Sequence, residues 1–192
     1  MNRPSILCRP ARAPIRFAAH FQAGVSLIES LLVLAVTTIA LGTGLPSFET
    51  ARERRHLEAA AAQLETDIHF VRSLAVAHNR TLRLSFAAGD AGSCYVVHTG
   101  TADDCTCAGD GSLSCSGGVQ VHRSVFFDSA SPVQLSTNVR SILFDPHQGT
   151  STPTGTLRVT GRSGATIHAI VSLMGRVRNC SPAPGLPGVP RC

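Results

Sequence analysis

Residues 24–45, GVSLIESLLVLAVTTIALGTGL, contain a single ionisable side chain, Glu29, in an otherwise apolar stretch. A helix of about 21 residues with a rise of 1.5 Å per residue is roughly 31 Å long, which matches the hydrocarbon core of a bilayer. The pattern therefore predicts a membrane-inserted helix over residues 25–45. A carboxylate within such a helix is unfavourable by a few kcal/mol unless a partner or a function compensates for it. Glu29 is thus the first candidate functional residue.

The segment before this run is basic. It contains four arginines, three prolines and no acid. Positive charge beside a membrane helix stays on the cytoplasmic side, so we expect the bulk of the chain on the other side, in the periplasm or outside the cell. Two interpretations of the apolar run are open: a secretory signal peptide cut after it, near residues 41–47, or a leader cut before it.

The motif GVSLIESLLVL resembles the processing site of type IV prepilins and type II secretion pseudopilins, with Val25 in place of the usual Phe. The resemblance implies that a prepilin peptidase removes residues 1–24, ending at Gly24, and that Val25 becomes the methylated N-terminus. It also implies that Glu29, fifth in the mature chain, acts in assembly with other pilins. Residues 25–45 would form the transmembrane and assembly helix of a single-pass protein of the bacterial inner membrane.

The helical pattern continues beyond Pro46, although this proline and two nearby glycines are expected to weaken or kink the helix. Apolar residues recur every three or four positions, which is typical of one buried helix face: Leu57, Ala61, Leu64, Ile68, Val71 and Ala75. We expect one long helix over about residues 25–78, stopping near Asn79. Residues 46–78 are its amphipathic continuation.

Short β-branched or alternating runs follow, separated by turn residues. They lie at 81–86, 94–99, 119–127, 139–144, 155–160 and 165–173. A helix packed on an antiparallel sheet is an α+β fold, with residues 79–192 as a β-rich periplasmic globular domain. The order of elements, including FDPHQGTSTPTGTLRV and IVSLMGRVRNC, resembles the GspH/FimT group of minor pilins and pseudopilins, which implies a pilin-like fold.

The mature chain has six cysteines: Cys94, Cys105, Cys107, Cys115, Cys180 and Cys192. In an oxidising compartment they indicate disulfides, with 15 possible connectivities. Cys180 with Cys192 is the simplest pair, because the two bracket a Pro/Gly segment. The alternative is a zinc site built from Cys94, His98, Cys105 and Cys107, but C-x-C with C-x3-H fits the usual zinc spacing poorly. We therefore expect no metal.

No catalytic motif of the common hydrolase, metalloprotease or phosphate-loop kinds occurs, so we expect no enzyme and no cofactor. The best candidate binding site is Gly175-Arg176-Val177-Arg178. In an extended segment, Arg176 and Arg178 face the same side, about 7 Å apart, close to the phosphate spacing of one nucleic-acid strand. Further cations that could help are Arg140, Arg158 and Arg162, and from residue 111 onward the acids are only Asp128 and Asp145.

In the GspH/FimT group, a GRxR segment near the C-terminus resembles the motif through which FimT-type minor pilins are thought to bind DNA during natural transformation. The match falls on Gly175, Arg176 and Arg178. Three hypotheses stay open: a FimT-like minor pilin that binds double-stranded DNA, a structural tip or priming subunit (FimU-like, or the secretion pseudopilin GspH), and, far less favoured, an exported enzyme.

Overall fold

The computed structural model describes residues 26–107, 111–182 and 186–192, with side chains described throughout except at residues 43–47. The chain divides into two compact units between Thr43 and Gly44. The predicted leader, with Gly24 and the predicted new N-terminus Val25, lies outside the described residues.

The helix expected over residues 25–78 is observed as α1, Leu27–His78, 52 residues long. The backbone N–H of Glu29 donates to both the carbonyl and the Oγ of Ser26, which acts as the N-terminal cap. The helix ends at His78, because Asn79 adopts a left-handed conformation with φ of 48° and the Arg80 N–H turns back to the Ala75 carbonyl. Pro46 does not end the helix.

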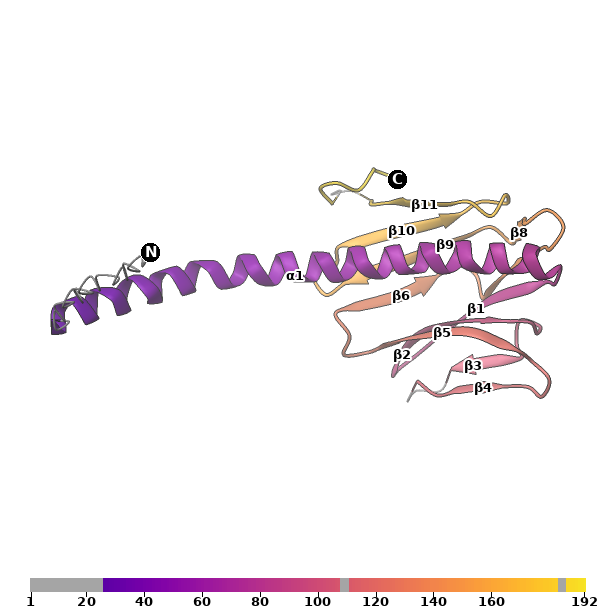
Figure 1. Ribbon diagram of the computed structural model, residues 1–192, viewed down its shortest axis with the longest axis horizontal. Helices are drawn as coiled ribbons and strands as arrows, with labels where there is room; N and C mark the ends of the chain where they lie inside the picture. Colours follow the sequence, from indigo (N-terminus) through magenta and orange to yellow (C-terminus); the bar gives the residue numbers. More distant parts are fainter. Residues whose placement is uncertain (1–25, 108–110, 183–185) are drawn as a thin grey trace, which may run out of the picture. The chain divides into compact units, whose positions relative to one another are not determined.

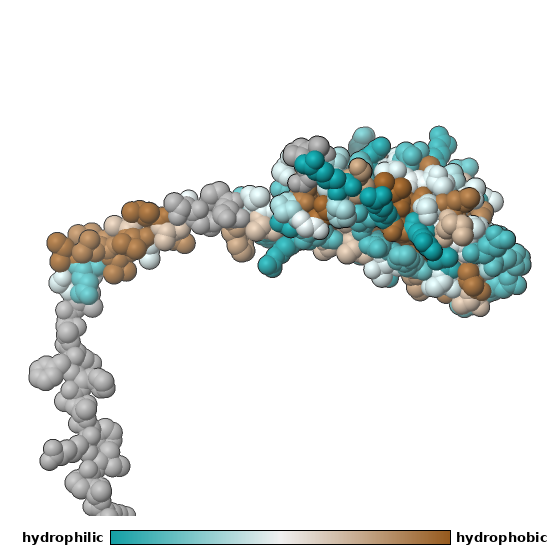
Figure 2. All heavy atoms as spheres, turned by 90° about the horizontal axis from the view of Figure 1, so that it is seen from above, coloured by the Kyte–Doolittle hydropathy of each residue, from teal (hydrophilic) through white to brown (hydrophobic). Residues whose placement is uncertain are grey.

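The first part of α1, residues 27–42, exposes large apolar side chains on all sides, and they appear in brown in Figure 2. Glu29 is exposed among them. Residues 25–45 stay a predicted membrane segment; within the residues that the structure describes, no helix is long and apolar enough to cross a membrane.

The later part of α1 buries the predicted stripe. All six of its residues are at most 2% exposed: Leu57, Ala61, Leu64, Ile68, Val71 and Ala75. Burying a side chain of the size of leucine or isoleucine contributes about 1.5–3 kcal/mol. The amphipathic half of the helix is therefore anchored on the sheets behind it (Figure 1).

The β-rich part contains two main antiparallel sheets, where a single sheet was expected (Figure 1). The first has the order β5-β2-β1-β7-β8, with bounds Val121–Asp128, Gly92–His98, Leu82–Gly89, Ser141–Phe144 and Ser151–Thr152. The second has the order β11-β10-β9-β6, with bounds Val177–Cys180, Thr166–Val171, Gly155–Gly161 and Val133–Thr137. Each of the six predicted runs contains or overlaps a strand, and the α+β prediction is confirmed.

A short hairpin, β3 (Cys105–Cys107) and β4 (Leu113–Cys115), forms a separate two-stranded sheet. One disulfide joins Cys105 to Cys115, which are direct partners across this hairpin, and a second joins Cys107 to Cys94 on β2. With Val96 these cysteines form a second apolar cluster. The hairpin therefore covers part of β2, which is buried along nearly its whole length.

Candidate nucleic-acid interface

The GRVR segment forms the turn between β10 and β11 and the start of β11. The Gly175 N–H donates to the Ser172 carbonyl at 2.8 Å, and the Ser172 N–H donates to the Arg176 carbonyl at 2.9 Å. Gly175 has φ of 67°, and a Cβ at this position would lie 2.6 Å from the carbonyl oxygen of Gly149. Both the conformation and the close approach require glycine here.

The helix also packs against this turn, through Arg72. The Nε of Arg72 on α1 donates to the Gly149 carbonyl at 2.9 Å, and a Cβ on Gly175 would also meet the Arg72 side chain. Gly175 is thus a packing residue at a junction of helix, loop and turn. Its role is to place the residues that follow it.

The alternation of β11 decides where the arginines point. Asn179 faces the helix, because its Nδ2 donates to Glu65 Oε2 at 2.6 Å, and Val177 packs on the core. Arg178 lies between these two residues and therefore faces solvent on the opposite side of the sheet. Arg176 is also exposed, so the predicted pair is available to a partner.

Arg158 joins this outer face from β9. It is exposed between the buried Leu157 and Val159, and it lies directly opposite His168 of β10. In the same sheet Ile170 of β10 lies opposite Arg178. The outer face thus carries Arg158 and His168 side by side, with Arg178 one strand further on.

No acidic residue occurs in the sequences of β6, β9, β10 and β11. The positive charge of this face is consequently not neutralised from within its own sheet. Burial, and then the neighbouring Arg158, lower the pKa of His168 below its ordinary value, which agrees with a half-buried base beside a cation.

The other arginines considered in the sequence lie elsewhere. Arg162 sits in the turn between β9 and β10, at the opposite end of that hairpin from Arg176. Its Nη2 donates to the Ala130 carbonyl, and the next residue, Ser163, donates its N–H to Glu53 Oε1. Arg140 lies on the connection between β6 and β7. The structure therefore groups Arg158 with the GRVR arginines and separates Arg162 from them.

Residues 60–175 match the family described as type II transport protein GspH, which is more than half of the chain. The chain belongs to the GspH family. Among solved structures, the type IV minor pilin FimU of Pseudomonas aeruginosa is similar at 20% identity, with a TM-score of 0.49, over 68% of this chain and 96% of FimU. No curated protein matches.

Membership of the GspH family makes this chain a minor pilin or pseudopilin of a type IV pilus or a type II secretion system. Such proteins assemble with other pilins or pseudopilins into the fibre. The six cysteines of the described residues form disulfides, as predicted: Cys94–Cys107, Cys105–Cys115 and Cys180–Cys192.

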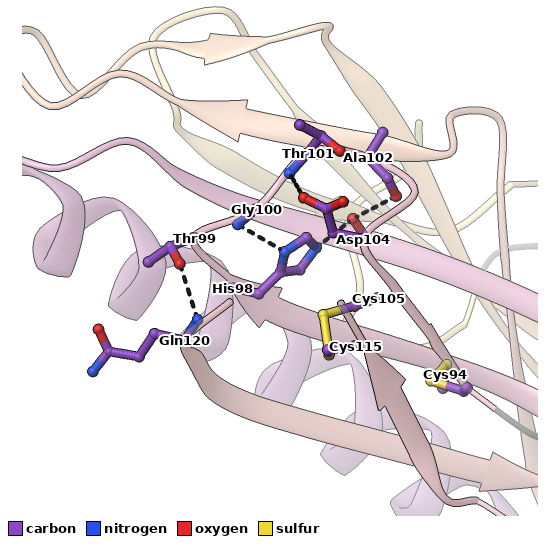
Figure 3. Close-up of a disulfide and its surroundings, with 12 residues drawn as sticks. Cys94, His98, Thr99, Gly100, Thr101, Ala102, Asp104, Cys105, Cys115 and Gln120 are labelled. Atoms are coloured by element: carbon purple, nitrogen blue, oxygen red, sulfur yellow. Dashed lines mark hydrogen bonds between the residues drawn. A yellow bond between two sulfur atoms is a disulfide. The ribbon is translucent and has the colours of Figure 1, made fainter. Parts of the chain in front are cut away.

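A serine and a histidine do meet in the globular unit, and their geometry bears on the enzyme hypothesis. His98 is buried, and its Nε2 lies 2.8 Å from Ser85 Oγ. The Gly100 N–H points at His98 Nδ1, 3.1 Å away (Figure 3). A backbone N–H can only donate, so Nδ1 accepts, and the ring proton sits on Nε2, where it is donated to Ser85. His98 in this form cannot take the proton of the serine, so the pair is not an activated nucleophile.

The four side chains of the zinc alternative also have other partners. Cys94, Cys105 and Cys107 are in disulfides, and His98 is bonded to Ser85 and Gly100. In the described part of the chain, no group of three or more potential metal-ligating side chains comes together.

His168 is the member of the outer face that the sequence analysis missed. The eight histidines are scattered along the sequence, and nothing local distinguishes this one. Its position beside Arg158 depends on the register between β9 and β10. The signal that could have found it is the alternation of TIHAIV, which places His168 on the face opposite Ile167 and Ala169.

Proposed function

We propose that this GspH-family protein is a FimT-like minor pilin that binds duplex DNA without sequence preference during natural transformation. The observation that carries the proposal is the acid-free outer face of the second sheet. Arg158, Arg176 and Arg178 are exposed there or at its edge, and His168 lies beside Arg158. Arginine suits phosphate contacts because its guanidinium forms paired hydrogen bonds to the oxygens.

Binding should be weak and dependent on salt. Each phosphate neutralised on duplex DNA contributes a slope of about −0.9 in log affinity against log salt. Two or three arginines therefore predict a slope of roughly −2 to −3 and an affinity near micromolar or weaker. Weak contacts suit a fibre that must capture DNA and later release it.

The test is a titration of the full-length protein, in mild detergent, with duplex DNA at two salt concentrations. We expect Arg176→Ala with Arg178→Ala to abolish the salt-sensitive binding and Arg158→Ala to weaken it. Arg162→Ala should have little effect, because that residue lies at the other end of the hairpin. Arg55→Ala, an exposed arginine on α1, is the matched control for loss of one charge. Equal binding by the wild type and the GRVR double variant would reject the proposal.

The second candidate function is a structural tip or priming subunit, either FimU-like in a type IV pilus or a GspH pseudopilin in type II secretion. It is favoured by the exposed apolar side chains of residues 27–42 and by Glu29 among them. In both candidates we propose that prepilin peptidase cleaves after Gly24, and that Glu29 pairs with the amine of Val25 of a neighbouring subunit. Residues 25–45 would lie in the inner membrane before assembly.

Processing and assembly can be tested separately from DNA binding. Mass spectrometry of the mature protein should give an N-terminus at Val25, and a start near Ser47 would contradict the pilin-type leader. Glu29→Ala should be processed normally but should be missing from purified fibres. Its incorporation at the wild-type level would reject the pairing with Val25.

A further inference from the structure

A small pocket lies where the last turn of α1 meets the beginnings of β1 and β5. Its volume is about 200 Å³, and its lining residues are Leu74, His78, Arg80, Leu82, Thr99, Gln120 and His122. The two leucines provide an apolar wall, and the others provide hydrogen-bonding or cationic groups. No carboxylate is among these residues.

The basic side chains of this pocket form no ion pair with an acid among the described residues. The ion pairs among the described residues are Arg54–Glu58, His69–Glu65 and Arg123–Asp67, and none of them includes a residue of the pocket. Burial lowers the pKa of His122, and the positive charges of His78 and Arg80 lower it further. Three basic groups from three segments therefore face the same small space.

We propose that this pocket binds a phosphate group through Arg80, His78 and His122. A phosphate dianion would accept a charge-assisted hydrogen bond from Arg80 and hydrogen bonds from the N–H groups of the two histidine rings. Thr99 can add a further donor, because its Oγ1 accepts the Gln120 N–H at 3.0 Å and its own hydroxyl proton stays available. The pocket is smaller than the roughly 300–1,000 Å³ of a typical organic-ligand site, which agrees with a small ion or a terminal group.

Stabilisation of the helix end explains only part of this cluster. Basic side chains near a helix C-terminus interact favourably with its dipole, and the Nδ1 of His78 lies 3.1 Å from the Leu74 carbonyl. His78 and Arg80 could be present for that reason alone. His122 comes from β5 and caps nothing in α1, so the helix end does not explain why its side chain lines the same pocket as His78 and Arg80.

The test uses the full-length protein in mild detergent, titrated with inorganic phosphate at constant ionic strength, with chloride as the reference anion. The histidine ring signals are followed by NMR. We expect saturable shifts for His122 and a rise of its pKa when phosphate is bound, since the dianion stabilises the protonated ring. Arg80→Ala and His122→Gln should each weaken phosphate binding about tenfold.

His147→Ala is the matched control, because His147 is an exposed histidine on the loop after β7, outside the pocket. It should leave phosphate binding unchanged. If His122→Gln keeps its fold and binds phosphate as the wild type does, or if phosphate causes no more shift than chloride, the cations serve only the helix end and the proposal is wrong.

A second arm identifies the source of the phosphate. Two duplex oligonucleotides, identical except for a 5′-phosphate, are compared in the Arg176→Ala/Arg178→Ala background, so the GRVR arginines do not contribute. If the protein prefers the phosphorylated duplex, the bound phosphate belongs to the end of a nucleic-acid strand. If it shows no preference but binds inorganic phosphate, the ligand is the free ion. Either result supports a phosphate site, and both are independent of whether the outer face of the second sheet binds DNA.

Discussion

Residues 27–42 and residues 57–75 of α1 are both rich in apolar side chains but differ in what covers them. Leu34 and Ile39 are 63% and 68% exposed, whereas Leu64 and Ile68 are 1% and 0% exposed. The later stretch places its apolar residues in one stripe that the two sheets cover. The earlier stretch is apolar around its whole circumference.

The difference shows that one helix can serve two purposes with the same residue types. The apolar stripe at residues 57–75 is buried within the globular unit and stabilises its fold. The large apolar side chains of residues 27–42, such as Leu34, are exposed instead, so we expect them to contribute little to the stability of the globular unit. Equivalent substitutions in the two stretches should therefore affect different measurements.

The largest contrast is expected between Ile68→Ala and Leu34→Ala. Removing a fully buried isoleucine side chain leaves a cavity against the sheets and should lower the free energy of unfolding by about 3 kcal/mol. Leu34→Ala removes an exposed side chain and should leave that free energy within about 0.5 kcal/mol of the wild type. Denaturant unfolding of the full-length protein in detergent measures both values.

Incorporation into fibres should show the opposite ranking of the two variants. Leu34→Ala should reduce incorporation more than expected from its small effect on the free energy of unfolding. If Leu34→Ala destabilised the globular unit as much as Ile68→Ala, residues 27–42 would have to be part of its fold, and the contrast between the stretches would be wrong.

The two stretches also carry contrasting carboxylates, Glu29 and Asp67. Asp67 is fully buried, and its Oδ2 accepts the Tyr95 hydroxyl at 2.6 Å and lies 3.0 Å from Arg123 Nε. Its other oxygen, Oδ1, has no hydrogen-bond partner among the described residues. Burial, and then the Asp67 carboxylate, raise the pKa of Tyr95, so this hydroxyl stays protonated and donates. The trio ties α1 to β2 and β5.

Asp67→Ala should lower the free energy of unfolding by about 2 kcal/mol, because the buried Tyr95 hydroxyl loses its acceptor. The partly exposed Arg123 can turn to solvent, so the effect should stay below that of breaking a fully buried ion pair. Glu29→Ala should leave unfolding unchanged. Thermal unfolding followed by circular dichroism compares the two variants, and a double variant Asp67→Ala/Tyr95→Phe that recovers stability would confirm the assigned cause.

Much of this contrast is readable from the sequence, because the helix period alone separates the two stretches. The six stripe residues from Leu57 to Ala75 recur at intervals of three or four residues, and all are buried. The helix period does not explain the burial of Asp67. It lies next to Ile68 on the buried side, and only the positions of Tyr95 and Arg123 in the folded sheets explain a carboxylate there.

The sheets were less predictable for a related reason. Strands β3, β4 and β8 have two or three residues each, too few for an alternation to be recognised, and β3 and β4 are held by disulfides. At the candidate interface, the sequence predicted that Arg176 and Arg178 share a face. It could not separate Arg162 from Arg158, because their positions depend on the pairing of β9 with β10.

The smallest expected effect is the dependence of stability on pH, which arises in the globular unit and leaves residues 27–42 unaffected. Burial, and then the charge of Arg83, lower the pKa of His98 below the ordinary value of about 6.5. Protonation at Nδ1 would also remove the acceptor of the Gly100 N–H, 3.1 Å away, and leave two N–H donors facing each other. The unfolded chain thus binds this proton more readily than the folded one. The contribution of His98 is complete above about pH 6.5 and is lost as the pH falls through the lower folded-state pKa.

The free energy of unfolding should therefore fall between about pH 7 and pH 5. In His98→Gln, whose amide can donate to Ser85 and accept from Gly100, this decrease in the free energy of unfolding should be smaller. The decrease that is left comes from His122 and His168, whose pKa values are also lowered. An unchanged pH profile in His98→Gln would show that His98 is not the group responsible.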